Sequence, residues 1–485
     1  MLEELNADSK PFQDDENSEE RAINLPDHVL ERSVWRKLDY WILPVITMFY
    51  LLSFLDRTNV GNARIAGLQK DLKMSNKEYA IALTLTYVAY VSSELPSNLV
   101  LKRIGPNFLL PIIMILWGLV ATLQGVVSDY HGLLACRFVL RFLEGGVPGI
   151  VLYLSFFYPR QRLQTRIATV FSAASPSGAF SGVLAYGIIH LDGARGLSDW
   201  SWIFIIEGAL TVAFGVSAFF LLPRSPAHAR FLSPQEKEYV ATRLRNDGVI
   251  SQDPKYDSFS WSEVGMAFRS PQVILVGIIC FLNGVALYGL AYFTPSIVQS
   301  LGFTAATAQL MSVPPFAVSA VATLAAALVS DFYKCRGVVI MGGSVICMAG
   351  FGLFLGSNNH HVQYGSLFLS IPGTYLIQPT LAAWNANNSA PYIRRATAMA
   401  LGFIMTNSGG ILATWLFGDL SPAPKYTKAT QTLLVFSVFM GVFSALNVWY
   451  LSVQNRSKGQ KRMEGLMPAD CESLGDRSAW FIYSL

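Results

Sequence analysis

Long apolar segments separated by short polar gaps dominate this chain and limit the folds that it can adopt. A window of about 19 residues finds roughly twelve segments, each long enough to cross about 30 Å of hydrocarbon as a helix. They lie near residues 40–63, 79–101, 108–127, 133–157, 166–190, 201–222, 273–298, 308–330, 338–356, 364–386, 396–418 and 430–452. The chain has 485 residues, of which 52% are hydrophobic and 14% charged. This composition predicts an all-α membrane protein that lies in the lipid bilayer.

Lys and Arg are distributed unevenly over the gaps, although the net charge is only +4. The gaps after spans two, four, six, eight and ten are basic: they contain Lys102 and Arg103; Arg160, Arg162 and Arg166; Arg224, Arg230, Lys237, Arg243 and Arg245; Lys334 and Arg336; and Arg394 and Arg395. Basic residues near span ends resist translocation, so these gaps are expected to be cytoplasmic. Both termini are then cytoplasmic as well. The lysines after span one are an exception to this pattern.

The longest polar interval divides the spans into two groups of six. The predicted organisation is an N-terminal tail over 1–37, a six-helix bundle over 38–222, a cytoplasmic linker over 223–268, a second six-helix bundle over 269–453 and a C-terminal tail over 454–485. In the linker, Ser233-Pro234-Gln235-Glu236 has the pattern of a capping box with proline at the first helical position, which predicts an amphipathic helix. Basic turns after the second span of each bundle, NLVLKRIGP and LVSDFYKCRG, indicate a weak internal repeat.

Ionisable residues inside the predicted spans mark the candidate site, because each costs at least about 2.5 kcal/mol to insert. Asp56 and Arg57 lie side by side near the end of span one. Span four contains CRFVLRFLEGGVPG, in which Arg137, Arg141 and Glu144 fall on one helix face. The five charges leave a cationic surplus, which suits a substrate with one carboxylate. Consecutive helix residues point about 100° apart, so Asp56 and Arg57 are expected to have different partners.

A second interpretation of these charges is a static ion-pair brace between helices. Arg141 is the strongest candidate for such a brace, because its neighbour Glu144 could satisfy it alone. Burial would favour the protonated form of a carboxyl here, whereas the arginines favour the charged form. The second bundle offers neutral polar residues in its spans, and among them Asn407 in MTNSGGI is expected to reach the cavity. Glycines and Pro148 after Glu144 predict a bend in span four.

No enzyme motif is present in the sequence. The chain has no Walker loop, no His/Cys cluster at metal-ligand spacing and no nucleophile motif. No cofactor, metal or nucleic-acid partner is predicted, and uphill transport would have to draw on an ion gradient.

Several motifs together resemble the fungal allantoate permease family, in the anion:cation symporter branch of the major facilitator superfamily. They are FLDRTNVGNARIAGL, ELPSNLVLKRIGP, CRFVLRFLEGGVPG, SGAFSGVLAYGI, LDGARGLSDWSWIFIIEG, LPRSPAHARFLSPQE and RRATAMALGFIMTNSGGI, and the resemblance covers about residues 35–456. It implies the major facilitator fold and proton-coupled symport of a small organic anion such as a vitamin or ureido acid. The partners implied are this anion, the proton and the bilayer. We expect a monomeric carrier in the plasma membrane, with a vacuolar or other organelle membrane as the alternative.

The resemblance also implies roles for individual residues. Arg57 and Arg137 would contact the substrate, and Asp56 and Glu144 would carry the proton. Tyr90, Asn407 and Arg141 complete the predicted substrate site, although the family usually has a small residue in place of Arg141. The residues predicted for the cytoplasmic gating loops are Lys102, Arg103, Asp331 and Arg336.

Two other functions fit the same sequence. An exporter of a carboxylated metabolite would have the same fold, because the direction of transport follows the gradients. A nutrient receptor that binds its ligand and hardly transports it is the third candidate, although the tails here are short for signalling.

Overall fold

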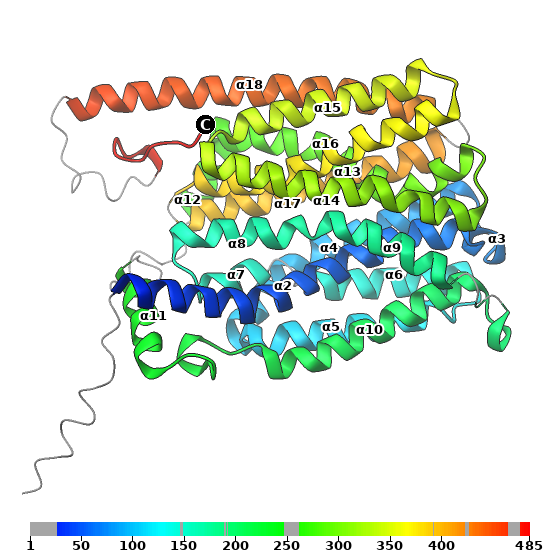
Figure 1. Cartoon of the computed structure of the whole chain (residues 1–485), viewed down its shortest axis with the longest axis horizontal. Helices are drawn as coiled ribbons and strands as arrows, with labels where there is room; N and C mark the ends of the chain where they lie inside the picture. The colour runs from blue at the N-terminus through cyan, green and yellow to red at the C-terminus, as the bar shows by residue number, and fades with distance from the viewer. Residues whose placement is uncertain are drawn as a thin grey trace, which may run out of the picture.

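The computed structural model describes residues 27–145, 149–188, 191, 193–246, 261–390, 392–421, 426–463 and 476–485. Helices that run roughly parallel to one another form the body of the molecule (Figure 1). In the first half they are α2 (Asp27–Ile65), α3 (Leu68–Asp71), α4 (Asn76–Ile104), α5 (Pro106–Gln124), α6 (Tyr130–Glu144), α7 (Gly149–Ser155), α8 (Arg160–Ser172), α9 (Ala174–Ile188) and α10 (Asp199–Leu221).

Two short helices follow, α11 (Pro234–Asn246) and α12 (Trp261–Arg269). The second half contains α13 (Pro271–Ser300), α14 (Ala305–Tyr333), α15 (Arg336–Gly356), α16 (His360–Asn387), α17 (Tyr392–Trp415) with a π-helical turn (Leu416–Leu420), and α18 (Thr427–Met463). Each of the twelve predicted spans coincides with one of these helices or with a pair of them.

Nine helices in the described part of the chain are long and apolar enough to cross a membrane. The other three predicted spans are also helical, in α4, in the pair α6 and α7, and in α16. The pair carries three of the predicted charges within its first helix, which lowers its hydropathy. The predicted multi-pass, all-helical fold is therefore confirmed.

Two predicted spans are each divided into two helices. In span four, α6 ends at Glu144 and α7 begins at Gly149, and the predicted bend at Gly146 and Pro148 lies outside the described residues. At Gly145 a side chain would place its Cβ 1.9 Å from Ser93 Oγ, so the close approach of α4 requires glycine. Span five breaks at Ala173, between α8 and α9. Pro176 follows in the first turn of α9, where its missing N–H is tolerated.

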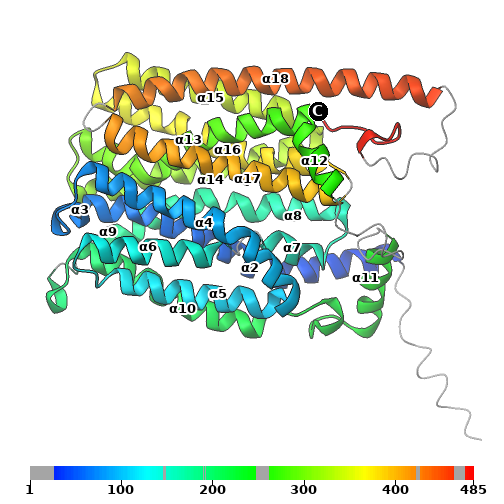
Figure 2. The ribbon, with the colours of Figure 1, turned by 180° about the vertical axis from the view of Figure 1, so that it is seen from behind.

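The two halves meet along four helix pairs: α2 with α13, α4 with α17, α8 with α16, and α9 with α14. Figures 1 and 2 show the first half below and the second half above this boundary. Backbones approach closely at the end near α3: a Cβ at Gly61 would lie 2.2 Å from Tyr292 O, and one at Gly410 would lie 2.4 Å from the ring of Tyr87. Apart from the lysines after span one, the loops at this end lack the basic clusters, so it is the expected outer side, and the halves are closed there.

The opposite end carries α11, α12 and residues 476–485 (Figure 1). The predicted capping box is present at the start of α11: the Ser233 amide donates to Glu236 Oε2 at 2.9 Å, and the Glu236 amide donates to Ser233 Oγ at 3.3 Å. Lys37 of α2 forms an ion pair with Glu236 at 2.8 Å. The predicted linker helix thus lies against the end of the first half that is expected to be cytoplasmic.

Candidate functional site

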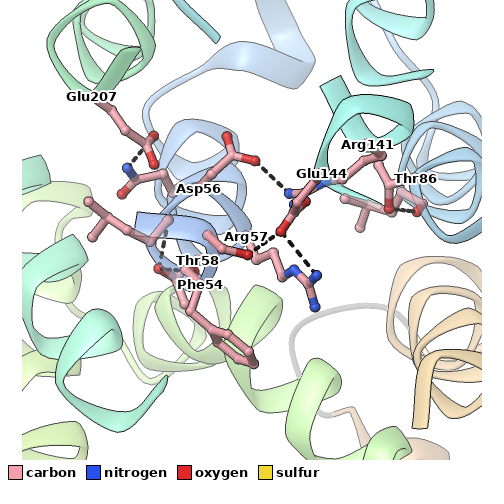
Figure 3. A network of polar contacts seen from close by, with 12 residues as sticks. Phe54, Asp56, Arg57, Thr58, Thr86, Arg141, Glu144 and Glu207 are labelled. Carbon is pink, nitrogen blue, oxygen red and sulfur yellow. Dashed lines mark hydrogen bonds and ion pairs between the residues drawn. The ribbon is translucent and has the colours of Figure 1, made fainter. Parts of the chain in front are cut away.

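Asp56 and Arg57 are buried in the middle of the molecule, and their side chains leave α2 in different directions (Figure 3). Asp56 Oδ2 accepts a hydrogen bond from Arg141 Nη2 at 2.6 Å. Arg57 Nη2 donates to Glu144 Oε1 at 3.1 Å, and its Nη1 donates to Tyr288 Oη at 2.7 Å. The prediction that these neighbours have different partners is correct.

Four of the charges form a chain of alternating sign between α2 and α6. The order is Asp56, Arg141, Glu144, Arg57, because Arg141 contacts both carboxylates and Glu144 contacts both arginines. Ser53 donates a further hydrogen bond to Glu144. Two buried polar atoms of this chain, Asp56 Oδ1 and Arg141 Nε, have no hydrogen-bond partner among the described residues. Arg141 therefore pairs with two carboxylates, not with Glu144 alone.

Arg57 is the member of the chain that reaches the second half. Its guanidinium carbon lies 5.4 Å from the ring centres of both Tyr90 and Tyr288. The Tyr288 hydroxyl in turn donates to Asn407 Oδ1 at 3.0 Å. Hydrogen bonds thus run from the charged chain across the boundary between the halves to the predicted residue Asn407 on α17.

A very small cavity lies beside this link, with room for about one water molecule. Its lining residues come from α2, α4, α6, α13 and α17: they are Arg57, Thr86, Tyr87, Tyr90, Arg141, Tyr292 and Asn407. The wall therefore has two guanidinium groups, several aromatic rings and an amide, and none of its lining residues is a carboxylate. Four of the five predicted substrate residues line it, and the two predicted proton carriers lie behind its arginines.

Arg137, the fifth predicted substrate residue, is not among the lining residues. It is 1% exposed and lies over the ring of Phe204 on α10, with its guanidinium carbon 5.4 Å from the ring centre. The same helix carries Glu207, which is also 1% exposed. Asn59 Nδ2 donates to Glu207 Oε2 at 2.6 Å. The site reasoning from the sequence missed Glu207, although it is a carboxylate inside the predicted span 201–222.

Glu207 corrects the predicted charge balance of the site. The expected surplus came from three arginines and two carboxylates, and the structure adds a third carboxylate to the same buried region. The buried cluster of three arginines and three carboxylates therefore has no net charge when all six groups are ionised. The cationic character belongs to the cavity wall, where Arg57 and Arg141 are the only ionisable groups apart from tyrosines.

The predicted gating residues can be placed only in part. Lys102 and Arg103 lie in the last turn of α4 and Asp331 lies near the end of α14, but their side chains are outside the described set. Arg336 begins α15, where its Nη1 donates to the carbonyl of Ala383 at 2.5 Å. Its backbone amide donates to the carbonyl of Leu485 at 2.7 Å. Over the described ranges, no group of three His, Cys, Asp or Glu side chains could hold a metal ion.

Comparison with known proteins places this arrangement in a family. The model of the Major Facilitator Superfamily matches residues 46–414. An uncharacterized transporter of Schizosaccharomyces pombe is 34% identical over 453 residues, covering 93% of this chain and 89% of its own length. The high-affinity nicotinic acid transporter of Saccharomyces cerevisiae is 30% identical over 442 residues, covering 91% of this chain and 82% of its own length.

Solved structures agree on the fold. A bacterial homologue of the human lysosomal transporter Spinster, in an inward-facing and occupied conformation, has a TM-score of 0.64 at 14% identity and covers 84% of this chain and 96% of that one. The xylose transporter XylE of E. coli has a TM-score of 0.63 at 14% identity and covers 83% and 96%. The chain belongs to the major facilitator superfamily, and it is a multi-pass membrane transporter.

Proposed function

We propose that this transporter is a proton-coupled symporter of a small organic anion and belongs to the anion:cation symporter branch that the allantoate permeases represent. The substrate class is a small carboxylate of the size and character of nicotinate. Each chain would work as a monomer, because the groups that bind the anion and the proton lie within one chain. The membrane that we propose is the plasma membrane.

The cavity wall is the observation that carries this proposal. Two buried guanidinium groups line the cavity, whereas the carboxylates that pair with them are not among the lining residues, and arginine binds a carboxylate through two parallel hydrogen bonds. Tyr87, Tyr90 and Tyr292 supply flat apolar surfaces and hydroxyl groups around the same space. Such a wall suits a planar or aromatic carboxylate better than a sugar, which needs many hydrogen-bond partners and no charge.

The alternating chain supplies the coupling in this proposal. With both carboxylates charged, Arg57 and Arg141 are neutralised by Glu144 and Asp56. Protonation of either carboxylate frees a guanidinium for the substrate anion. When the anion leaves to the cytoplasm, the guanidinium draws the carboxylate back to its charged form and the proton is released. Binding of the proton and of the anion then favour each other, and this linkage is reciprocal.

Similarity supports the substrate class. A relative that matches 91% of this chain is a nicotinic acid transporter. Nicotinate carries one carboxylate on an aromatic ring, which are the two features that the cavity wall complements.

Uptake into proteoliposomes tests the proposal. Purified full-length protein would be given radiolabelled nicotinate with the pH outside below the pH inside, and nicotinamide would serve as the matched neutral compound. We expect accumulation of nicotinate above equilibrium that collapses with a protonophore, and none of nicotinamide. A thermal-shift panel of other small carboxylates covers the case of a different anion, because a bound ligand stabilises the fold. Stabilisation by neutral compounds and by no carboxylate would refute the proposal.

A further inference from the structure

Glu207 belongs to a second polar centre, on the side of α2 away from the cavity. Figure 3 shows it apart from the chain of Arg57 and Glu144, next to the segment of α2 that carries Asp56. It is not one of the cavity-lining residues. The proposed symport mechanism makes no use of it, so its presence inside the bundle needs its own explanation.

A directed set of hydrogen bonds ends on this carboxyl group. Asn62 Nδ2 donates to Ser181 Oγ, Ser181 Oγ donates to Asn59 Oδ1, and Asn59 Nδ2 donates to Glu207 Oε2, each at 2.6 Å. All three donors point towards Glu207. Its other oxygen, Oε1, is buried and has no hydrogen-bond partner among the described residues. That oxygen is available to carry a proton or to accept from a donor that moves.

Arg137 is the unpaired counterpart of this carboxyl group. Its Nη1 and Nη2 atoms are buried and have no hydrogen-bond partner within the described part of the structure. The guanidinium lies over Phe204, which stands one turn before Glu207 on α10. The buried carboxylate belongs to α10, and the buried cation, from α6, lies against the same stretch of α10. Each has an unmet hydrogen bond, so together they are the parts of an ion pair that can open and close.

We infer that Glu207 is a third proton-binding carboxyl of this carrier and that Arg137 is the counter-ion that replaces the proton. In the closed pair, Arg137 neutralises the Glu207 carboxylate. When Glu207 takes a proton on Oε1, Arg137 turns away to Phe204, as it does here. One proton is bound and one ion pair is broken in this step, so the charge of the centre rises by one.

Few other charged groups surround Glu207 and Arg137. Asp56 on α2 and Arg137 and Arg141 on α6 are the charged residues that interact with Glu207 electrostatically. The helix in most extensive contact with α10 is α5, whose range Pro106–Gln124 has no Asp, Glu, His, Lys or Arg. Helix α9 contributes Tyr186 as its sole titratable side chain. Asp56 therefore connects the second centre to the first, because it also pairs with Arg141.

A role of Glu207 in coupling rests on the proposed symport. Proton binding by Glu207 does not, and it is tested first. Infrared difference spectroscopy of the purified full-length protein, acidified without any substrate, records the carbonyl stretch of buried carboxylic acids. Glu207→Gln should lose part of this signal, and Glu207→Asp, which keeps the carboxyl group, should shift its frequency. Glu236→Gln, which changes a buried glutamate at the cytoplasmic end, is the matched control and should leave the signal unchanged. An unaltered acid signal in both Glu207 variants would overturn the inference, whatever the substrate is.

Transport gives the second test. With radiolabelled nicotinate as the probe, Glu207→Gln should retain exchange between labelled and unlabelled substrate but lose accumulation driven by a pH gradient. Glu207→Asp should restore part of the accumulation. Undiminished pH-driven accumulation in Glu207→Gln would contradict a coupling role. If wild-type protein carries no nicotinate at all, the proposed substrate fails while the infrared result still decides whether Glu207 binds a proton.

Discussion

The two halves of the transporter divide the chemistry of the site unequally. In the described residues, the first half holds all the carboxylates and guanidiniums in the middle of the bundle, namely Asp56, Arg57, Arg137, Arg141, Glu144 and Glu207. The second half faces them with neutral groups, among them Tyr288, Tyr292 and Asn407. Its own buried charges, Arg336, Arg394, Lys458 and Asp476, lie at the end that is expected to be cytoplasmic.

This difference indicates how the two halves can move relative to each other without the free-energy cost of separating buried ion pairs. Every ion pair in the charged chain is formed within the first half, between α2 and α6. The second half is connected to the chain through the hydrogen bond between Arg57 and Tyr288. The halves can then rock about the cavity while the buried ion pairs stay closed, which fits alternating access by rigid-body motion of one bundle against the other.

We expect Arg141→Gly to have the largest effect, because it removes the cation that joins two carboxylates in the first half. It leaves Asp56 and Glu144 buried without their shared cation, and breaking a buried pair costs about 3–5 kcal/mol. We expect a large drop in the thermal unfolding midpoint of the purified protein and a low yield of monodisperse material. The double variant Arg141→Gln with Asp56→Asn removes one charge of each sign and should recover much of the loss. A folded Arg141→Gly protein with wild-type stability and altered substrate preference would show that Arg141 sets specificity and is not a brace.

Arg57→Ala should abolish binding at the boundary between the halves. The substrate carboxylate would lose its guanidinium partner in a buried site, at a cost of about 2–5 kcal/mol. Affinity for the transported anion, measured by calorimetry, should fall at least about 30-fold. Lys77→Ala, at an exposed lysine in the first turn of α4, is the control and should bind normally. Affinity within threefold of wild type in Arg57→Ala would remove this residue from the site.

Tyr288→Phe tests whether the second half, which contributes neutral groups to the site, takes part in substrate binding. The substitution deletes the hydroxyl that accepts from Arg57 and donates to Asn407, with an expected loss of about 1–3 kcal/mol. We expect weaker substrate binding with little change in the unfolding midpoint. Tyr292→Phe is the comparison variant, because its hydroxyl has only a long hydrogen bond of 3.4 Å from Tyr87. Equal effects of the two substitutions would argue against a special link through Tyr288.

The smallest effect is expected outside the membrane, at Glu236. Burial acts to raise the pKa of Glu236, but hydrogen bonds from Lys37 and from the Ser233 amide outweigh it and hold the pKa below its ordinary value. The resulting stabilisation is fully present above the unfolded-state pKa of about 4.3 and is lost as the pH falls through the lower folded-state pKa. Lys37 is partly exposed, so the gain is about 0.5 kcal/mol. Glu236→Gln should lower the unfolding midpoint slightly at neutral pH and not in strong acid. An equal difference at both pH values would contradict the assignment.

Much of the fold could be predicted because it depends on local patterns. Hydropathy alone locates the spans, and the Ser233–Glu236 pattern predicts the start of α11. The break in span five at Ala173 was harder to predict, because Pro176 falls in a segment whose hydropathy continues through it. The lengths of α2 and α18 also exceed the predicted spans, since both helices continue into polar residues beyond the apolar segment.

Most charged residues of the site could be predicted from the sequence, whereas in the neutral half only Asn407 was predicted to reach the cavity. Carboxylates and guanidiniums are conspicuous in an apolar span, and the same signal identifies Glu207. Tyr288 is different, because a tyrosine in a long apolar helix has the pattern of ordinary packing. Its contact with Arg57 joins residues that are 231 positions apart, and no local pattern encodes such a contact. The direction of Arg137, towards α10 and away from the cavity, likewise depends on how α6 is rotated in the bundle.

The central claim is that the chain of Asp56, Arg141, Glu144 and Arg57 couples the proton to the anion. The most direct measurement compares exchange and pH-driven uptake, side by side in proteoliposomes, for wild type and for Asp56→Asn with Glu144→Gln. The amides mimic the protonated carboxyls, so the double variant should still bind the anion and exchange it across the membrane. It should no longer accumulate the anion in response to a pH gradient. Undiminished pH-driven accumulation in the double variant would show that the proton travels by another route and that Asp56 and Glu144 serve as structural partners of the arginines.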